Sequence, residues 1–225
     1  MPHFDIVKQS EIEDTFRVSK IKADYDVKTE HANEHFSGNI DLPEKWNIGI
    51  IVGASGTGKS TIAKELFSEN LISGFDYHAK SVVDDMPQGK SIDEISKMFY
   101  SVGFGSVPSW LKPYAVLSNG EKMRVDLARA MLERDEIVFD EFTSVIDRNV
   151  AQTACIAINK AIKANNKKFI AVSCHYDIIN WLQPDWIFDT NEMKFSFMNA
   201  HELQKNLRSE NAIEASGRSL KNIII

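Results

Sequence analysis

Short apolar runs and helical apolar repeats alternate along the middle of the chain. Residues 48–52 form an apolar run that predicts a strand, and residues 61–67 place apolar side chains at helical spacing. Similar runs predict strands at 136–139 and 169–174, with a helix at 148–164 between them. This alternation is typical of an α/β fold with a parallel core sheet.

The flanks of this core predict further strands. Residues 16–27 and 36–42 have the pattern of two antiparallel strands, and residues 81–85 that of a short strand. Residues 186–188 and 194–197 predict the closing strands. The first residues of the chain are polar, and we expect them to be irregular.

A glycine-rich segment, Gly-Ala-Ser-Gly-Thr-Gly-Lys-Ser, fills residues 53–60 between a predicted strand and a predicted helix. Its glycines allow close backbone approach, so that N–H groups and the helix N-terminus face phosphate oxygens. Lys59 is predicted to bridge the β and γ phosphates, and Ser60 to supply a hydroxyl to Mg²⁺. The predicted nucleotide contacts are Gly53, Ala54, Ser55, Gly56, Thr57, Gly58, Lys59, Ser60 and Thr61.

Two carboxylates follow the strand predicted at 136–139. Asp140 is predicted to hold the Mg²⁺ shell and Glu141 to polarise the attacking nucleophile. Adjacent residues of a strand point to opposite faces, so both can serve one site only if the chain turns there.

Two helices are predicted to begin at capping boxes. Ser91 with Glu94 caps a helix at 91–100, and Ser118 with Glu121 caps a second helix. The N–H groups of Ser118, Asn119 and Gly120 would be free to face a γ phosphate.

Residues 117–121, Leu-Ser-Asn-Gly-Glu, resemble the Leu-Ser-Gly-Gly-Gln signature of ABC-type ATPases. We call residues 117–121 the signature segment. The resemblance implies a P-loop NTPase fold with an ABC-type nucleotide-binding domain. It also implies a homodimer with two sandwiched ATP molecules, in which the signature of one copy completes the ATP site of the other.

Smaller motifs fit this resemblance. Residues 143–147 are similar to the D-loop, with Asp147 at the dimer seam, and His175 to the switch histidine that contacts the γ phosphate. Gln88 is similar to the Q-loop residue that senses metal and attacking water. Tyr25 is at a suitable distance before the phosphate loop to stack on adenine. Its competitors for that role are Phe16, Phe36 and Trp46.

The chain departs from the family pattern in places. Asn119 replaces a glycine, Glu121 a glutamine, and Phe142 a common proline. The inserted lobe, at about 89–117, is short for a transporter cassette. The segments 138–148 and 173–186 resemble a narrower soluble group, found alone or beside a predicted acetyltransferase domain.

These motifs suggest a division of the chain into three parts. Residues 1–15 are a polar segment, residues 16–200 the ABC-type ATP-binding domain, and residues 201–225 a C-terminal tail.

Composition adds few constraints. The 225 residues carry a net charge of −6, which does not indicate nucleic-acid binding. Basic residues nevertheless cluster in two places: near the N-terminus at Arg17, Lys20, Lys22 and Lys28, and at the end of the helix predicted at 148–164 with Lys160, Lys163, Lys167 and Lys168. No apolar run approaches the roughly 20 residues that cross a bilayer, so we expect no membrane association and a cytoplasmic location, the host cytoplasm if the gene is viral. Cys155 and Cys174 are expected to be buried free thiols, and no zinc site is predicted.

The leading hypothesis is a soluble ABC-type ATPase that acts on DNA or on a nucleic-acid-processing partner. The alternative is a kinase that transfers the γ phosphate to 5-hydroxymethyluracil in phage DNA, with Glu141 or Asp85 as base. The third interpretation is the ATP-binding subunit of a transporter.

Overall fold

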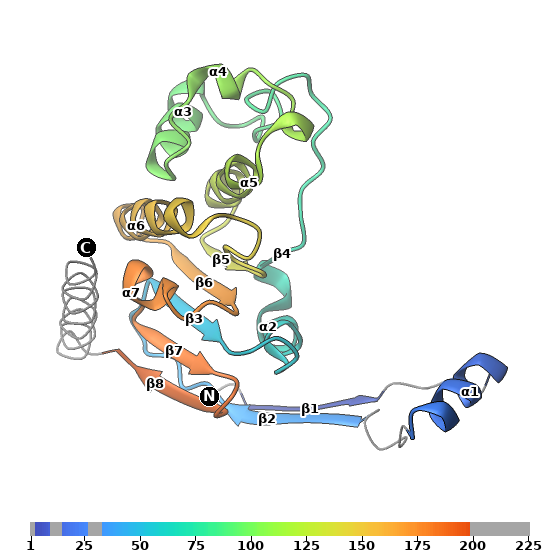
Figure 1. Ribbon diagram of the computed structural model, residues 1–225. Helices are drawn as coiled ribbons and strands as arrows, with labels where there is room; N and C mark the ends of the chain where they lie inside the picture. Colours follow the sequence, from blue (N-terminus) through green and yellow to red (C-terminus); the bar gives the residue numbers. More distant parts are fainter. Residues whose placement is uncertain (1–2, 10–14, 27–32, 199–225) are drawn as a thin grey trace, which may run out of the picture.

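The computed structural model describes residues 3–9, 15–26 and 33–198 and is centred on a six-stranded sheet (Figure 1). The strands run in the order β4 (Leu71–Ile72), β5 (Glu136–Phe139), β6 (Lys168–Ser173), β3 (Ile48–Val52), β7 (Trp186–Asp189) and β8 (Lys194–Phe197). Strands β4 to β7 are parallel in this order, and β8 is antiparallel to β7 at the edge. The predicted α/β fold with a parallel core sheet is confirmed.

Apolar side chains pack on both faces of the sheet. On one face, Ile48, Ile50 and Val52 join a cluster formed with helices α3, α5, α6 and α7. On the other face, Ile51 packs with α2 and with a separate hairpin. The helices are α2 (Lys59–Phe67), α3 (Ile92–Ser101), α5 (Asn119–Glu133), α6 (Arg148–Ala164) and α7 (Ile178–Leu182). Because both faces are covered, β3 is apolar at successive positions.

A close contact holds β3 against its neighbour β7. A Cβ atom on Gly49 would lie 2.0 Å from the indole of Trp186, which is fully buried. Trp186 also meets Trp46 edge-on, with ring centroids 5.5 Å apart. Gly49 therefore lets the strand that leads into the glycine-rich segment lie tight against the indole ring.

The hairpin consists of β1 (His3–Gln9) and β2 (Asn33–Asn39), paired antiparallel, and it extends from the core beside α2 (Figure 1). Phe4 anchors β1, because its ring is buried and meets Phe188 edge-on at 5.7 Å. Residues 36–42 are therefore partly in a strand, as predicted. The expectation of an irregular start was wrong for residues 3–9.

The strand predicted at residues 16–27 was also wrong. Residues 16–24 form helix α1 (Phe16–Asp24), whose N-terminus is capped by the Thr15 side chain accepting from the Val18 N–H at 3.3 Å. None of its residues is buried, so no sheet neighbour competes with this local capping. Residue 27 lies outside the described residues.

Residues 81–85 form turns instead of the predicted strand. The Asp85 carboxylate accepts from the N–H groups of His78 and Ala79, each at 3.0 Å, and the Ser81 hydroxyl donates to Asp84. These side chains satisfy nearby polar groups locally and so favour turns over a ladder.

An upper lobe stands above the sheet in Figure 1 and contains α3, α4 (Val107–Trp110) and α5. Both predicted capping boxes are confirmed, at Ser91 on α3 and at Ser118 on α5. The remaining short turns of helix are η2 (Ser68–Asn70) and η3 (Tyr114–Val116).

A half-buried carboxylate ties the connection after β4 to the upper lobe. The hydroxyls of Tyr77 and Tyr114 donate to Asp126 on α5 at 2.8 and 2.7 Å, and the two rings stack at 3.9 Å. Burial raises the pKa of Asp126. This contact holds the segment that precedes Gln88 against the helix of the signature segment.

The two cysteines differ in their environments. Cys155 is buried in α6, where burial raises the pKa of its thiol to about 12. Cys174 follows β6 and is exposed, so its predicted burial was wrong, although both are free thiols. Within the described residues, no helix combines the length and apolar character needed to span a bilayer. The predicted C-terminal tail lies outside the described residues.

Candidate functional site

Three predicted motifs meet at one edge of the sheet. The glycine-rich segment follows β3, Asp140 follows β5 and His175 follows β6. Strand β6 lies between β5 and β3 and is parallel to both, so the carboxyl ends of the three strands share this edge. Ligands of open α/β sheets bind at such an edge.

The glycine-rich segment, which we call the phosphate loop, has the backbone that its glycines allow. Gly56 and Gly58 have φ angles of 85° and 84°, and Gly58 directly precedes α2 in the left-handed region. A Cβ atom on Gly58 would lie 2.7 Å from the ring of Phe36 on β2. Gly58 is therefore required both by its φ angle and by the hairpin that packs against it.

Lys59 extends over the loop from the first residue of α2. Its side chain is buried, and its Nζ donates to the Ala54 carbonyl at 2.6 Å. A pocket of about 210 Å³ opens beside it. The pocket is lined by Lys8, Ser55, Gly56, Gly58, Lys59, Ser60, Thr61 and Glu141.

Ser60 and Asp140 come together from different elements. The Ser60 hydroxyl donates to Asp140 Oδ1 at 3.0 Å, which joins the start of α2 to the end of β5. Magnesium favours oxygen ligands and usually keeps one or two protein ligands together with phosphates and water. A hydroxyl beside a carboxylate fits that donor set. Within the described part of the chain, no group of three or more His, Cys, Asp and Glu side chains forms a separate metal cage.

The chain turns sharply at Glu141. Its φ angle is 52°, a conformation that is strained for a residue with a side chain. Two bonds fix it: the Glu141 N–H donates to Asp140 Oδ1 at 2.9 Å, and the Ser144 hydroxyl donates to the Glu141 carbonyl at 2.7 Å. The structure thus provides the turn that the two adjacent carboxylates require. Glu141 lines the phosphate-loop pocket and Asp140 reaches Ser60.

The backbone around His175 is tied to the segment after Asp140. The His175 N–H donates to Ser173 Oγ at 3.1 Å, and that hydroxyl donates to the Phe142 carbonyl at 2.9 Å. His175 is half-buried and does not line the phosphate-loop pocket. Its contact with a γ phosphate stays a prediction.

Arg148 connects the loop after His175 to the D-loop segment. It forms a two-point ion pair with Asp177, with Nε donating at 2.9 Å, and its guanidinium lies over the Trp181 ring. It also donates to the Thr143 hydroxyl at 3.3 Å. Asp147, predicted at a dimer seam, caps α6 by accepting from the Asn149 N–H at 2.8 Å. The positions of the two loops are therefore coupled.

The signature segment does not line the phosphate-loop pocket of its own chain. Ser118 is exposed at the start of α5, and the backbone hydrogen bond from Ser118 lowers the pKa of Glu121. The Asn119 side chain donates to the Val145 carbonyl at 3.4 Å. A Cβ atom on Gly120 would approach Val150 to 3.2 Å. Asn119, which departs from the family pattern, thus ties the signature segment to the D-loop.

Two predicted site residues are not brought to the phosphate loop. Gln88 is exposed in a turn and does not line its pocket. Tyr25 is 73% exposed at the end of α1, which Figure 1 places at the outer end of the hairpin, well away from α2. Their roles in metal sensing and adenine stacking stay predictions.

The sequence predictions missed three residues near the phosphate loop, namely Asn191, Thr190 and Lys8. Asn191 Oδ1 accepts from the Ala54 N–H at 3.1 Å, and the hydroxyl oxygens of Thr190 and Thr57 lie 2.5 Å apart. Because these contacts join distant parts of the chain, no local pattern indicates them. The third residue, Lys8, could have been found, since Phe4, Ile6 and Lys8 recur at strand spacing.

Tyr176 links this region to the loop of His175. Its hydroxyl donates to Asp189 at 2.9 Å and accepts from the Asn191 side chain at 2.7 Å. Burial, followed by the bond to Asp189, raises the pKa of Tyr176 to about 12. The turn between β7 and β8 therefore connects the phosphate loop with the residue next to His175.

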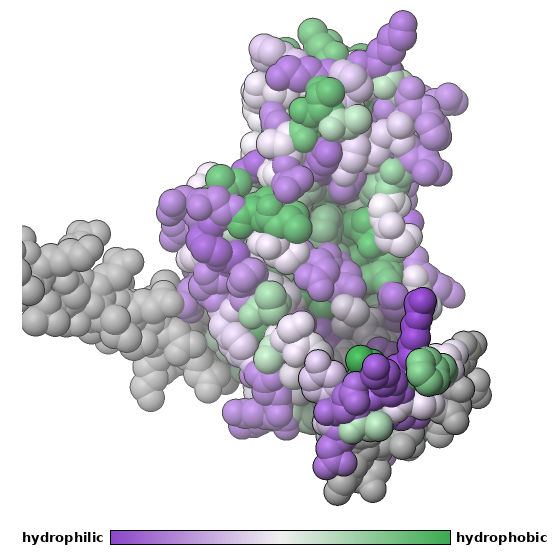
Figure 2. Space-filling view, turned by 45° about the vertical axis from the view of Figure 1, so that its right-hand side comes forward, coloured by the Kyte–Doolittle hydropathy of each residue, from purple (hydrophilic) through white to green (hydrophobic). Residues whose placement is uncertain are grey.

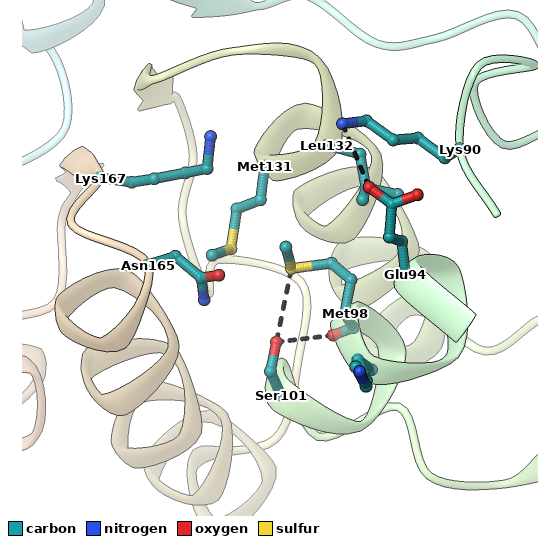
Figure 3. A pocket seen from close by; sticks show the side chains of 9 residues that line it. Lys90, Glu94, Met98, Ser101, Met131, Leu132, Asn165 and Lys167 are labelled. Atoms are coloured by element: carbon teal, nitrogen blue, oxygen red, sulfur yellow. Dashed lines mark hydrogen bonds and ion pairs between the residues drawn. The ribbon is translucent and has the colours of Figure 1, made fainter. Parts of the chain in front are cut away.

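A second pocket, of about 370 Å³, lies between α3 and the last turns of α5 and α6 (Figure 3). Met98 and Met131 contribute apolar surface to it. Two of its lysines already pair with carboxylates, Lys90 with Glu94 at 3.6 Å and Lys167 with Asp135 at 2.9 Å. It has no counterpart of the phosphate loop or of the pair formed by Ser60 and Asp140.

The sequence of the chain resembles known proteins only in part. No family model matches the chain. It is 29% identical over 164 residues to prion formation protein 1 of Saccharomyces cerevisiae, a match that covers 59% of this chain and 14% of that protein. The chain therefore spans a small part of that relative.

Solved structures show the fold more clearly. The cbiO1 protein of Clostridium perfringens, part of the ABC transporter complex cbiONQ, superposes with a TM-score of 0.62 at 18% identity, covering 85% of this chain and 91% of that one. A dimeric bacterial ABC transporter cassette superposes with a TM-score of 0.54 at 15% identity, covering 74% and 93%. The same cassette is also known as a dimer bound to ADP and Pi. The chain therefore has the P-loop NTPase fold of the ABC-type ATP-binding cassettes.

Proposed function

We propose that the protein binds ATP with Mg²⁺ and hydrolyses the β–γ bond. The observation that carries this proposal is the hydrogen bond between Ser60 and Asp140 at the edge where Lys59 and Glu141 line one pocket. Two segments thus meet here: the phosphate loop with the start of α2, which carries Lys59 and Ser60, and the end of β5, which is followed by Asp140 and Glu141. Phosphoryl transfer requires mainly this positioning and charge neutralisation.

Each residue then has a distinct role. The N–H groups at the start of α2 and the Lys59 ammonium bind the phosphate chain. Ser60 and Asp140 would hold Mg²⁺, and the metal would supply positive charge beside the phosphates. Glu141, which lines the pocket, orients the attacking water and accepts its proton.

We further propose that two copies form the working enzyme, with Ser118, Asn119 and Gly120 of one facing the phosphate loop of the other. The dimeric form of a structural neighbour supports this, as does the exposure of Ser118 and Asn119 in the signature segment. Val116 and Val145, beside the signature segment and in the D-loop, are 65% and 67% exposed. Figure 2 shows apolar side chains exposed at the waist between the upper lobe and the sheet. Exposed apolar surface of this kind marks interaction sites.

A bulky cation at the signature segment tests the dimer. We expect Ser118→Arg to bind ATP normally and to lose at least about 100-fold in turnover, because the arginine blocks the seam between copies. Turnover per molecule of the wild type should rise with protein concentration.

The matched control is Ser91→Arg, which removes the equivalent capping box on α3. Both variants lose about 1 kcal/mol of stability from helix capping. A difference in turnover between them therefore reports on the interface between the two copies. Equal turnover in the two variants would rule out the proposed dimer site.

For the partner, we propose a nucleic acid. The support is the lysine cluster at the end of α6, where Lys160 and Lys163 are exposed. Its charge is limited, because Lys167 pairs with Asp135, and Lys168 with Glu136. We expect duplex DNA to raise the ATPase rate several-fold at low salt, with the gain lost at high salt. An ATPase rate that duplex DNA does not change at low salt would exclude a nucleic acid as the partner.

The structural neighbours bear differently on the kinase and the transporter interpretations. The structural neighbours give no support to transfer of phosphate to a DNA base. Two of them are described as transporter components, so a role as the ATP-binding subunit of a transporter is compatible with the fold.

A further inference from the structure

The hairpin is packed firmly against the phosphate loop. Phe4 and Phe36 are 2% and 8% exposed and belong to the same apolar cluster as Ile62 and Phe67 of α2. The ring of Phe36 also lies directly against Gly58. Phe4 and Phe36 therefore anchor the hairpin beside the start of α2, and Lys8 follows Phe4 along the same strand.

Lys8 lies on the inward face of this hairpin. Side chains of a strand alternate between its faces, so Phe4, Ile6 and Lys8 share one face of β1. Phe4 is buried and Ile6 packs on the same cluster, whereas Val7, on the opposite face, is 57% exposed. Lys8 lies on the same face of β1, beyond these apolar contacts, and it lines the phosphate-loop pocket.

Two lysines consequently line the phosphate-loop pocket. Lys8 enters from the hairpin and Lys59 from α2, and Glu141 is the carboxylate among the lining residues. A nucleoside triphosphate keeps negative charge even with Mg²⁺ bound, and cations beside its oxygens form charge-assisted hydrogen bonds. The site thus offers more positive charge than the phosphate loop alone provides.

We propose that Lys8 is a second phosphate-contacting lysine, which binds the phosphate chain of the nucleotide from the hairpin side. This role rests on the proposed function. The lysine is a flexible point charge on an exposed strand, so it contributes to nucleotide affinity more than to the bond-breaking step.

The test compares Lys8→Ala, Lys8→Arg and the wild type by calorimetric titration with Mg-ATP. Lys20→Ala, on exposed helix α1 beyond the hairpin, is the matched control. We expect Lys8→Ala to raise the Kd about tenfold with little change in kcat, because one charge-assisted hydrogen bond is lost. Lys8→Arg should stay within about threefold of the wild type, since it keeps the charge. Unfolding temperatures should agree among the four proteins.

Two results would overturn this role. One is a Kd for Lys8→Ala equal to that of Lys20→Ala while the wild type binds Mg-ATP. The other is equal weakening by Lys8→Ala and Lys8→Arg, which would assign the effect to hairpin packing instead of charge. A wild type that takes up no Mg-ATP would instead reject the proposed function, and the role of Lys8 with it.

Discussion

Glu141→Gln should still bind ATP but hydrolyse it about 1,000-fold more slowly than the wild type. Glutamine is nearly isosteric and keeps the contacts of its own backbone with Asp140 and Ser144, but it cannot accept a proton from water. Single-turnover measurement of released phosphate at saturating ATP checks the loss. Calorimetry of the same variant checks that binding is retained.

The control for this variant is Glu136→Gln. Glu136 begins the same strand, β5, but its carboxylate meets Asn70 and Lys168 away from the pocket. This control should hydrolyse ATP at nearly the wild-type rate. If Glu141→Gln kept a rate within threefold of the control, another group would be the base and our assignment would fail.

Lys59→Ala should lose ATP binding by at least about 100-fold. The ammonium would make charge-assisted hydrogen bonds to two phosphates in a buried setting, and each is worth a factor of ten or more. Fluorescent-nucleotide titration measures the loss, and turnover should fall with it.

The control for this loss is Lys64→Ala, an exposed lysine of the same helix. It should leave affinity unchanged, and both variants should unfold cooperatively. Binding by Lys59→Ala at wild-type affinity would mean that the phosphate loop does not hold the nucleotide.

The parts that could be predicted are those in which a short segment determines its own backbone. Glycines 56 and 58 adopt positive φ in the phosphate loop, and Ser118 caps α5 through Glu121, which is three residues away. Helix α6 spans 148–164, as its apolar repeat predicts. Strands that are buried on both faces of the sheet, such as β3, can also be predicted, because they are apolar at successive positions.

The predictions were wrong where local polar side chains or contacts between distant parts of the chain determine the backbone conformation. Thr15 caps a helix over residues 16–24, whose apolar spacing resembled that of a strand. Asp85 accepts hydrogen bonds that close turns at residues 81–85, where two adjacent valines suggested a strand. The bond from Ala54 to Asn191 depends on how β7 and β3 pair, which no single segment records. Lys8 was missed because the polar residues around it hid the strand spacing of Phe4, Ile6 and Lys8.

The most direct test of the central claim is calorimetric titration of the folded wild type with ATP in the presence and absence of Mg²⁺. We expect one ATP bound per chain, with higher affinity when Mg²⁺ is present, and a higher unfolding temperature in saturating Mg-ATP. No heat of binding and an unchanged unfolding temperature would contradict it.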